Sequence, residues 1–171
     1  TYRIYRDLRF TQDKTPYKGH FGAYINADGK KAYYGGYYIQ FEPRQVMFAS
    51  GVWWLPTKEM RALRQAIVDQ ADTYTQIVEE PEFKRLCPTI GLDHYKRIPN
   101  GFPKDFAHPD YLLCKDYTCH TALTPTQFQK AEVADIARLF RLMKPFNDFL
   151  KENVLINYEE MEGMKDVVKF L

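Results

Sequence analysis

Cationic and aromatic side chains alternate near the start of the chain, a pattern that suits the binding of an anion. The stretch RDLRFTQDKTPYKGHFG, residues 6–22, interleaves arginine, lysine and histidine with phenylalanine and tyrosine. Guanidinium groups bind phosphates and carboxylates through paired hydrogen bonds, and a loop stiffened by proline holds its lysines at a lower entropic cost. We therefore expect an anion to be bound by this set of side chains: Arg6, Arg9, Lys14, Tyr17 and Lys18.

A second charged stretch, GFPKDFAHPDYLLCK at residues 101–115, could supply acid–base groups. A lysine, a carboxylate and a histidine in one loop can donate, accept and orient a proton. Glu42 ends a predicted strand, and with the nearby Trp53 it could form one wall of a pocket. The expected catalytic residues are Glu42, Asp105 and His108. The further ligand-binding residues are Trp53, Lys104 and Lys115.

Each of these groups also has a purely structural interpretation. Arg6 falls on the apolar face of its predicted strand, where it could pair with Glu42, since buried ion pairs exist without catalysis. The lysine-rich loop could be a solvated turn, and residues 104–108 are of types common on any surface. Of two adjacent tryptophans, Trp53 and Trp54, one could fill the core while the other half-covers the surface.

Several common kinds of site are absent from the sequence pattern. His108, Cys114, Cys119 and His120 are close in sequence, but neither Cys-x-x-Cys nor His-Glu-x-x-His appears, so we expect no metal and no cofactor. Glycine-rich nucleotide loops and the Gly-x-Ser-x-Gly element are also missing, which argues against the common nucleotide-binding folds and α/β-hydrolases.

Composition predicts a cytoplasmic protein that does not enter the membrane. The three cysteines form no pairing pattern and are expected to be reduced thiols. No apolar run approaches the roughly 20 residues that cross a bilayer. The net charge of +2 does not by itself indicate nucleic acid as a partner.

The periodicity of apolar residues changes from two to between three and four about a third of the way along the chain. The expected strands are residues 1–10, 20–26, 33–43, 45–56 and 111–123, with close backbone approach at Gly51. The expected helices are residues 60–74 and 81–86, with a short one in the tail 157–171. A further helix is expected to open at a capping box at residues 124–127 and to be kinked or broken at Pro145. Its inward-facing residues are expected to be Phe128, Val133, Ile136, Phe140 and Met143. The pattern predicts one α+β domain over residues 1–171, an antiparallel sheet of about five strands with helices largely on one face.

These stretches resemble a family known as domain of unknown function 2461, found in bacteria and fungi. The resemblance rests on YRDLRFTQDKTPYKGHFG, GGYYIQFEP, SGVWWLP followed by LRQAI, and KRIPNGFPKDFAHPDYLLCKDY, and it extends over residues 2–150. The family pattern includes the charged positions named above and also Arg64. The resemblance implies a helical segment upstream of these stretches. This chain departs from the family pattern by lacking that segment, so we expect it to have been cut away or left out. It implies no known activity.

Three functions fit these observations. The first is a pocket that binds an anionic small molecule, carrying phosphate or carboxylate, between residues 6–18 and 101–115, with acid–base catalysis left open. The second is a module that binds nucleic acid or a partner protein through the basic and aromatic stretch, with rings stacking on bases. The third is a structural domain whose charges pair internally.

Overall fold

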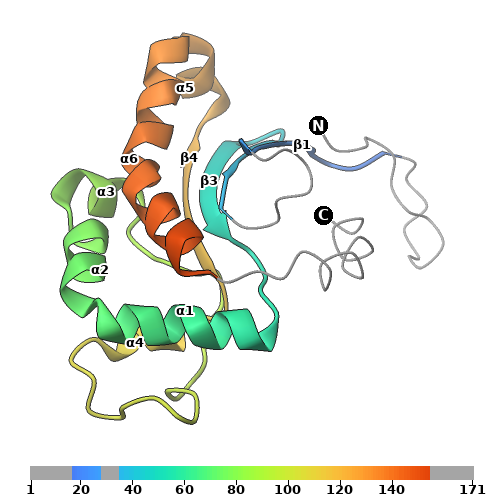
Figure 1. Ribbon diagram of the computed structural model, residues 1–171. Coiled ribbons are helices and arrows are strands. Elements are labelled where there is room, and N and C mark those ends of the chain that lie inside the picture. Colours follow the sequence, from blue (N-terminus) through green and yellow to red (C-terminus); the bar gives the residue numbers. More distant parts are fainter. Residues whose placement is uncertain (1–16, 28–34, 155–171) are drawn as a thin grey trace.

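A computed structural model describes residues 17–27 and 35–154 of the chain. Its four strands form one antiparallel sheet in the order β1-β2-β3-β4 (Figure 1). The strands are β1 (Phe21–Ile25), β2 (Tyr37–Phe41), β3 (Val46–Val52) and β4 (Tyr117–Leu123). A short turn, residues 42–45, joins β2 to β3, whereas helices and a long loop separate β3 from β4. The fold class is therefore α+β, as the sequence predicts.

Side chains of β3 alternate between the two faces of the sheet because successive residues of a strand point in opposite directions. Val46, Phe48, Ser50 and Val52 are buried, and the residues between them are less so. The Phe48 ring packs at 5.9 Å from Phe140 of the last helix. This face of the sheet carries the core, and burial of its apolar side chains is the main stabilising contribution.

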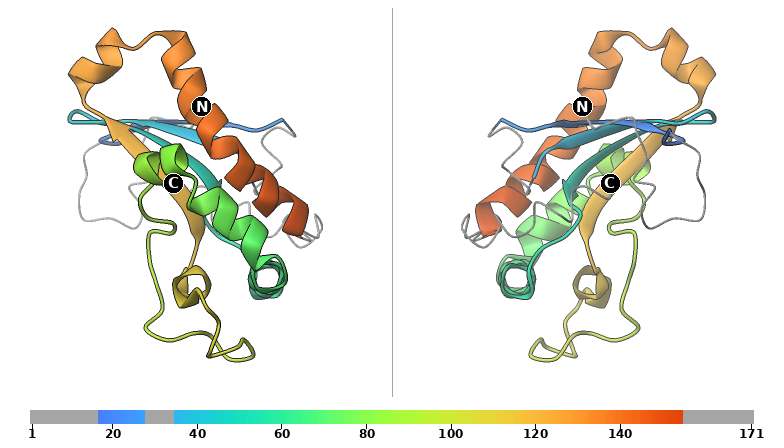
Figure 2. Two further views of the ribbon diagram at one scale, coloured as in Figure 1. Left: turned by 90° about the vertical axis from the view of Figure 1, so that its left-hand side faces the viewer. Right: turned by 90° about the vertical axis from the view of Figure 1, so that its right-hand side faces the viewer.

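The described residues form six helices, which lie mainly on one side of the sheet (Figures 1 and 2). Their bounds are α1 (Thr57–Asp69), α2 (Ala71–Val78), α3 (Pro81–Leu86), α4 (Pro109–Leu113), α5 (Pro125–Lys130) and α6 (Val133–Asn153). Helix α5 begins at the predicted capping box, in which Thr124 and Gln127 bond reciprocally. Aromatic rings pack between helices: the ring centres of Tyr74 on α2 and Phe149 on α6 are 5.1 Å apart.

The long segment between α3 and β4 adds backbone pairing to the outer edge of β4. Ile90 pairs with Cys119 and His94 with Cys114, each as an isolated antiparallel bridge. The amide of Gly91 donates to the carbonyl oxygen of Thr118 at 2.8 Å. Residues 90–95 therefore run along the start of β4, although the sequence predicts only loop there.

The structure corrects two expected boundaries and does not describe two other expected elements. The strand expected at residues 111–123 begins only at Tyr117, because residues 111–113 belong to α4. The helix expected over residues 60–74 is two helices that meet at Gln70. The expected strand 1–10 and the expected tail helix 157–171 lie outside the described residues.

The helix expected to kink or break at Pro145 is not broken there, since α6 continues through this residue to Asn153. Proline removes one backbone hydrogen bond, but the buried side chains of Met143, Phe146 and Phe149 on either side of it keep the helix packed. Val133, which was expected to face inward, is 87% exposed because the helix breaks at Ala131, just ahead of it.

Candidate functional site

The sequence-predicted site residues fall at opposite ends of the sheet. Glu42 follows β2 in the turn to β3, whereas Trp53 follows β3 at the end where β4 begins. Antiparallel pairing separates them by the length of β3, about 20 Å at roughly 3.4 Å per residue. Lys115 lies at the Trp53 end. The structure therefore does not bring Glu42 and Trp53 together as one wall of a pocket.

The turn between β2 and β3 borders a shallow, open hollow of about 550 Å³, which Gly19 and residues 42–45 line. The two carboxylate oxygens of Glu42 accept hydrogen bonds from the side-chain amides of Gln40 and Gln45. Tyr17 and Lys18 adjoin Gly19 in the chain, so they and Glu42 lie at the same end of the sheet. Arg6, Arg9 and Lys14 lie outside the described residues.

The predicted acid–base loop projects at the opposite end of the molecule, below α1 and α4 in Figure 1. Lys104 and Asp105 are exposed there. His108 precedes α4, and its ring stacks on Tyr111 at 4.9 Å with an interplanar angle of 11°. The structure brings these residues near α1, far from Glu42.

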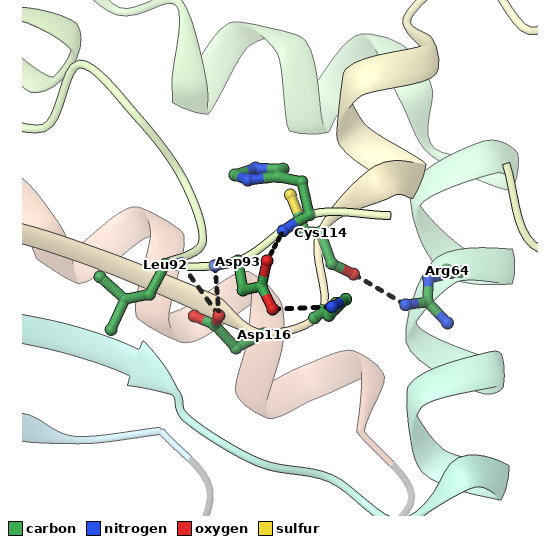
Figure 3. A network of polar contacts seen from close by, with 7 residues as sticks. Arg64, Leu92, Asp93, Cys114 and Asp116 are labelled. Atoms are coloured by element: carbon green, nitrogen blue, oxygen red, sulfur yellow. Dashed lines mark hydrogen bonds and ion pairs between the residues drawn. The ribbon is translucent and has the colours of Figure 1, made fainter. Parts of the chain in front are cut away.

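A buried arginine lies where α1 meets the start of β4. Arg64 is on the inward face of α1, between the fully buried Leu63 and Ile67, and is only 6% exposed. Its Nη2 donates to the carbonyl oxygen of Cys114 at 2.7 Å (Figure 3). This bond connects two elements that the chain separates by α2, α3 and the long loop.

Tyr95 lies beside two cations. The Arg64 guanidinium carbon is 5.5 Å from the centre of the Tyr95 ring, and Lys115 Nζ is 5.3 Å from it. Both distances allow cation–π attraction. The structure thus brings together the predicted residue Lys115, Arg64 from the family pattern, and a tyrosine that the sequence analysis did not single out.

Lys115 also forms an ion pair with Asp93 at 2.7 Å. This hydrogen bond raises the pKa of Lys115 above its usual value and is the main cause of the lowered pKa of Asp93. Both side chains are largely exposed, so the pair is screened by solvent and contributes little to stability.

Asp116 fixes the loop that carries Tyr95. Its carboxylate accepts from the backbone amides of Leu92 at 2.9 Å and Asp93 at 3.3 Å (Figure 3). It also accepts from the hydroxyl of Thr118. These three donors satisfy a carboxylate that is only 6% exposed. The loop is therefore held against β4 by a hydrogen-bonded buried charge.

Arg64 itself lacks a countercharge. Across residues 17–27 and 35–154, no carboxylate lies within 4 Å of its guanidinium group, and Nε has no hydrogen-bond partner. The neighbouring Tyr117 supplies no charge either, because burial raises the pKa of its phenol, whose hydroxyl donates to the carbonyl oxygen of Tyr111 at 2.7 Å. A buried cation that forms no ion pair with a neighbouring acid attracts an anion.

Sequence reasoning omitted Arg64, Tyr95 and Asp116 from the candidate site. A signal existed for Arg64, which interrupts the apolar stripe of α1 between Leu63 and Ile67. No pattern marks Tyr95 or Asp116, since their roles depend on pairing between residues 90–95 and β4. In the described part of the chain, no three His, Cys, Asp or Glu side chains are grouped as metal ligands. None of the described helices is long and apolar enough to cross a bilayer.

The fold and this site define an α+β protein with one antiparallel sheet and a buried, unpaired arginine at the sheet's end. The chain matches the conserved hypothetical protein family DUF2461 over residues 1–149 and belongs to that family. Searches among curated proteins and among solved structures give no significant match.

Proposed function

We propose that this protein binds an anionic small molecule, carrying phosphate or carboxylate, at the corner formed by Arg64, Tyr95 and Lys115. One observation carries the proposal: Arg64, a buried arginine, has no carboxylate partner within 4 Å among the described residues. An unpaired buried charge is costly, and an anion bound beside it would offset that cost.

The geometry suits an anion with more than one acceptor oxygen. The planar guanidinium fork binds phosphate and carboxylate through parallel hydrogen bonds, and Lys115 adds a second positive charge near the same ring. The ion pair between Lys115 and Asp93 is exposed and weak, so Lys115 can turn toward a ligand at small cost.

The proposal assigns binding, and catalysis remains a prediction. Asp105 and His108 belong to the loop on this side of the molecule, so they are the predicted acid–base groups that a ligand here could approach. Glu42 lies at the other end of the sheet and takes no part. A role for Arg6, Arg9 and Lys14 stays a prediction, because these residues lie outside the described part of the chain.

A thermal-shift and calorimetric titration with inorganic phosphate, pyrophosphate and citrate tests the site, at constant ionic strength set with KCl. A ligand at 100 times its Kd stabilises the folded protein by about 2.7 kcal/mol. For a chain of this size that is a rise in melting temperature of roughly 5–10 °C. The variant Lys115→Met should weaken binding by roughly tenfold, as expected for one lost charge-assisted hydrogen bond of about 1.5 kcal/mol.

Lys84→Met is the matched control. Like Lys115, Lys84 is an exposed lysine paired with one acid, here Glu79, but it lies on α3. Arg64→Lys keeps the positive charge but removes the guanidinium fork. It should therefore weaken the binding of anions that accept two parallel hydrogen bonds more than it weakens the binding of chloride. Equal binding by wild type, Lys115→Met and Arg64→Lys would overturn the proposal, as would the absence of binding by all three anions.

A further inference from the structure

Cations and acids are distributed unevenly over the described part of the molecule. Residues 53–64 and 91–115, which we call the basic lobe, contain seven lysines and arginines and four acids. Five of these cations are exposed and have no carboxylate within 4 Å among the described residues. They are Lys58, Arg61, Lys96, Arg97 and Lys104. Unpaired exposed cations gathered on one lobe attract a polyanion.

The rest of the described chain carries nine lysines and arginines against eleven acids, so cations do not predominate there. Four of these cations, Arg44, Arg85, Lys130 and Arg141, are also exposed with no carboxylate within 4 Å among the described residues. Three others are paired, Lys84 with Glu79, Arg138 with Glu82 and Lys144 with Asp148, in or next to α2, α3 and α6. These pairs lie near acids that are dense between residues 69 and 82. A polyanion would therefore be attracted to the basic lobe and repelled by the acid-rich helices.

Contacts within the basic lobe join its two segments into one surface. Arg61 of α1 donates to the carbonyl oxygen of Asn100 at 3.2 Å and lies 5.5 Å from the Phe102 ring. Arg64 bonds to Cys114 and approaches Tyr95. In Figures 1 and 2, α1, α4 and the long loop that leads into α4 lie together at one end of the molecule.

Large aromatic rings are exposed in the same lobe. Trp53 is 50% exposed, Trp54 is 46% exposed and Tyr95 is 45% exposed. Val52 pairs with Tyr117, so the tryptophans follow at the end of the sheet where β4 and residues 90–95 meet. Exposed tryptophans beside one another are unusual on a surface that binds nothing, since each ring carries a large apolar area.

We infer that the basic lobe binds single-stranded nucleic acid. Unpaired cations can contact successive phosphates, while exposed indole and phenol rings provide faces on which bases stack. A simple anion would use the cations and leave the rings without a role. Helix α1 buries its apolar face in the core, so it is not an amphipathic helix available to a lipid surface. This inference goes beyond the proposed anion site: it shares Tyr95 with that site but rests mainly on other exposed residues, the five unpaired cations and the two tryptophans.

Fluorescence anisotropy with fluorescein-labelled 12-nucleotide oligo(U) and oligo(dT) tests the inference with the whole chain. Affinity should fall as KCl rises from 50 to 200 mM, because each phosphate contact contributes about −0.7 to the slope of log K against log salt. The double variant Lys96→Gln/Arg97→Gln should bind about tenfold or more weakly and reduce that slope by about 1.4. Trp53→Leu/Trp54→Leu should weaken binding by at least fivefold, with little change in slope.

The matched control is Lys84→Gln/Lys144→Gln, which removes the same net charge from the acid-rich helices and should leave affinity within twofold. A second basic-lobe variant, Lys58→Gln/Lys104→Gln, repeats the test if either first variant unfolds, as judged by circular dichroism. The inference is overturned by a lack of oligonucleotide binding at 50 mM KCl or by an equal loss in the control. The inference is also overturned if the protein binds vesicles of phosphatidylcholine and phosphatidylserine more tightly than it binds oligonucleotides, and Trp53→Leu/Trp54→Leu does not change that binding.

One comparison separates this surface from the Arg64 site. Lys96→Gln/Arg97→Gln should lose oligonucleotide binding but keep the binding of inorganic phosphate.

Discussion

Arg64 and Cys114 lie 50 positions apart in the chain, yet the guanidinium group of one donates to the backbone carbonyl oxygen of the other at 2.7 Å. The bond attaches α1 to the residues that lead into β4. Because the acceptor is a neutral carbonyl, the positive charge of Arg64 is positioned without being neutralised. The same contact therefore stabilises the fold and leaves a charge available for a ligand.

Replacement of Arg64 by methionine should lower the free energy of unfolding by about 1–3 kcal/mol, because it removes a charged donor and leaves a buried carbonyl without a partner. Urea denaturation followed by circular dichroism measures the change. Arg141→Met is the control, since Arg141 is an exposed arginine of α6 and its loss should cost less than about 0.5 kcal/mol. Equal effects of the two variants would contradict a structural role for Arg64.

The pair of Asp93 and Lys115 predicts a defined pH dependence. The pKa of Asp93 is lowered on folding from 3.8, so its stabilising effect is present above that value and is lost as the pH falls through the folded pKa. The pKa of Lys115 is raised from 10.5, so its effect is present below that value and is lost as the pH rises through the folded pKa. The ion pair therefore stabilises the folded protein only between the pKa of Asp93 and the pKa of Lys115. In Lys115→Met, carboxyl carbon NMR should show the pKa of Asp93 returning toward 3.8, whereas Lys84→Met should leave it unchanged.

The sheet and most helices could be predicted from the sequence because their signals are local. Alternating apolar residues mark β3, and the Thr124–Gln127 capping box marks the start of α5. The break at Gln70 and the continuity of α6 through Pro145 depend on packing between elements, which a local pattern does not report.

The candidate site was harder to predict because it depends on which strand ends meet. Glu42 and Trp53 are close in sequence, but antiparallel pairing places them at opposite ends of β3. Lys115 was predicted to bind a ligand, and that role stays a prediction, although the structure places its side chain beside Tyr95 and Asp93. Arg64 finds its partner in a backbone carbonyl, which no pattern of side chains announces.

The three cysteines should be unreactive while the protein is folded. All of them are buried, and burial raises the pKa of Cys114 to about 12 and that of Cys119 well above its usual value. The thiolate is the reactive form, and the raised pKa values leave little of it at Cys114 and Cys119 at pH 8. Ellman's reagent should titrate no thiol in the native protein and three in guanidinium chloride. Rapid reaction of any thiol in the native protein would show that these side chains are accessible.

Gly51 should tolerate no side chain, because its backbone lies against β4. Its φ is +114°, a conformation that side chains rarely adopt, and a Cβ atom would lie 2.1 Å from the carbonyl oxygen of Tyr117. Gly51→Ala should therefore lower the free energy of unfolding by more than about 2 kcal/mol, through backbone strain and separation of β3 from β4. Gly19→Ala is the control, since nothing lies within 4 Å of a Cβ atom there. Urea denaturation of the two variants checks the prediction, and a loss at Gly51 no greater than at Gly19 would show that the β3–β4 pairing accommodates a methyl group.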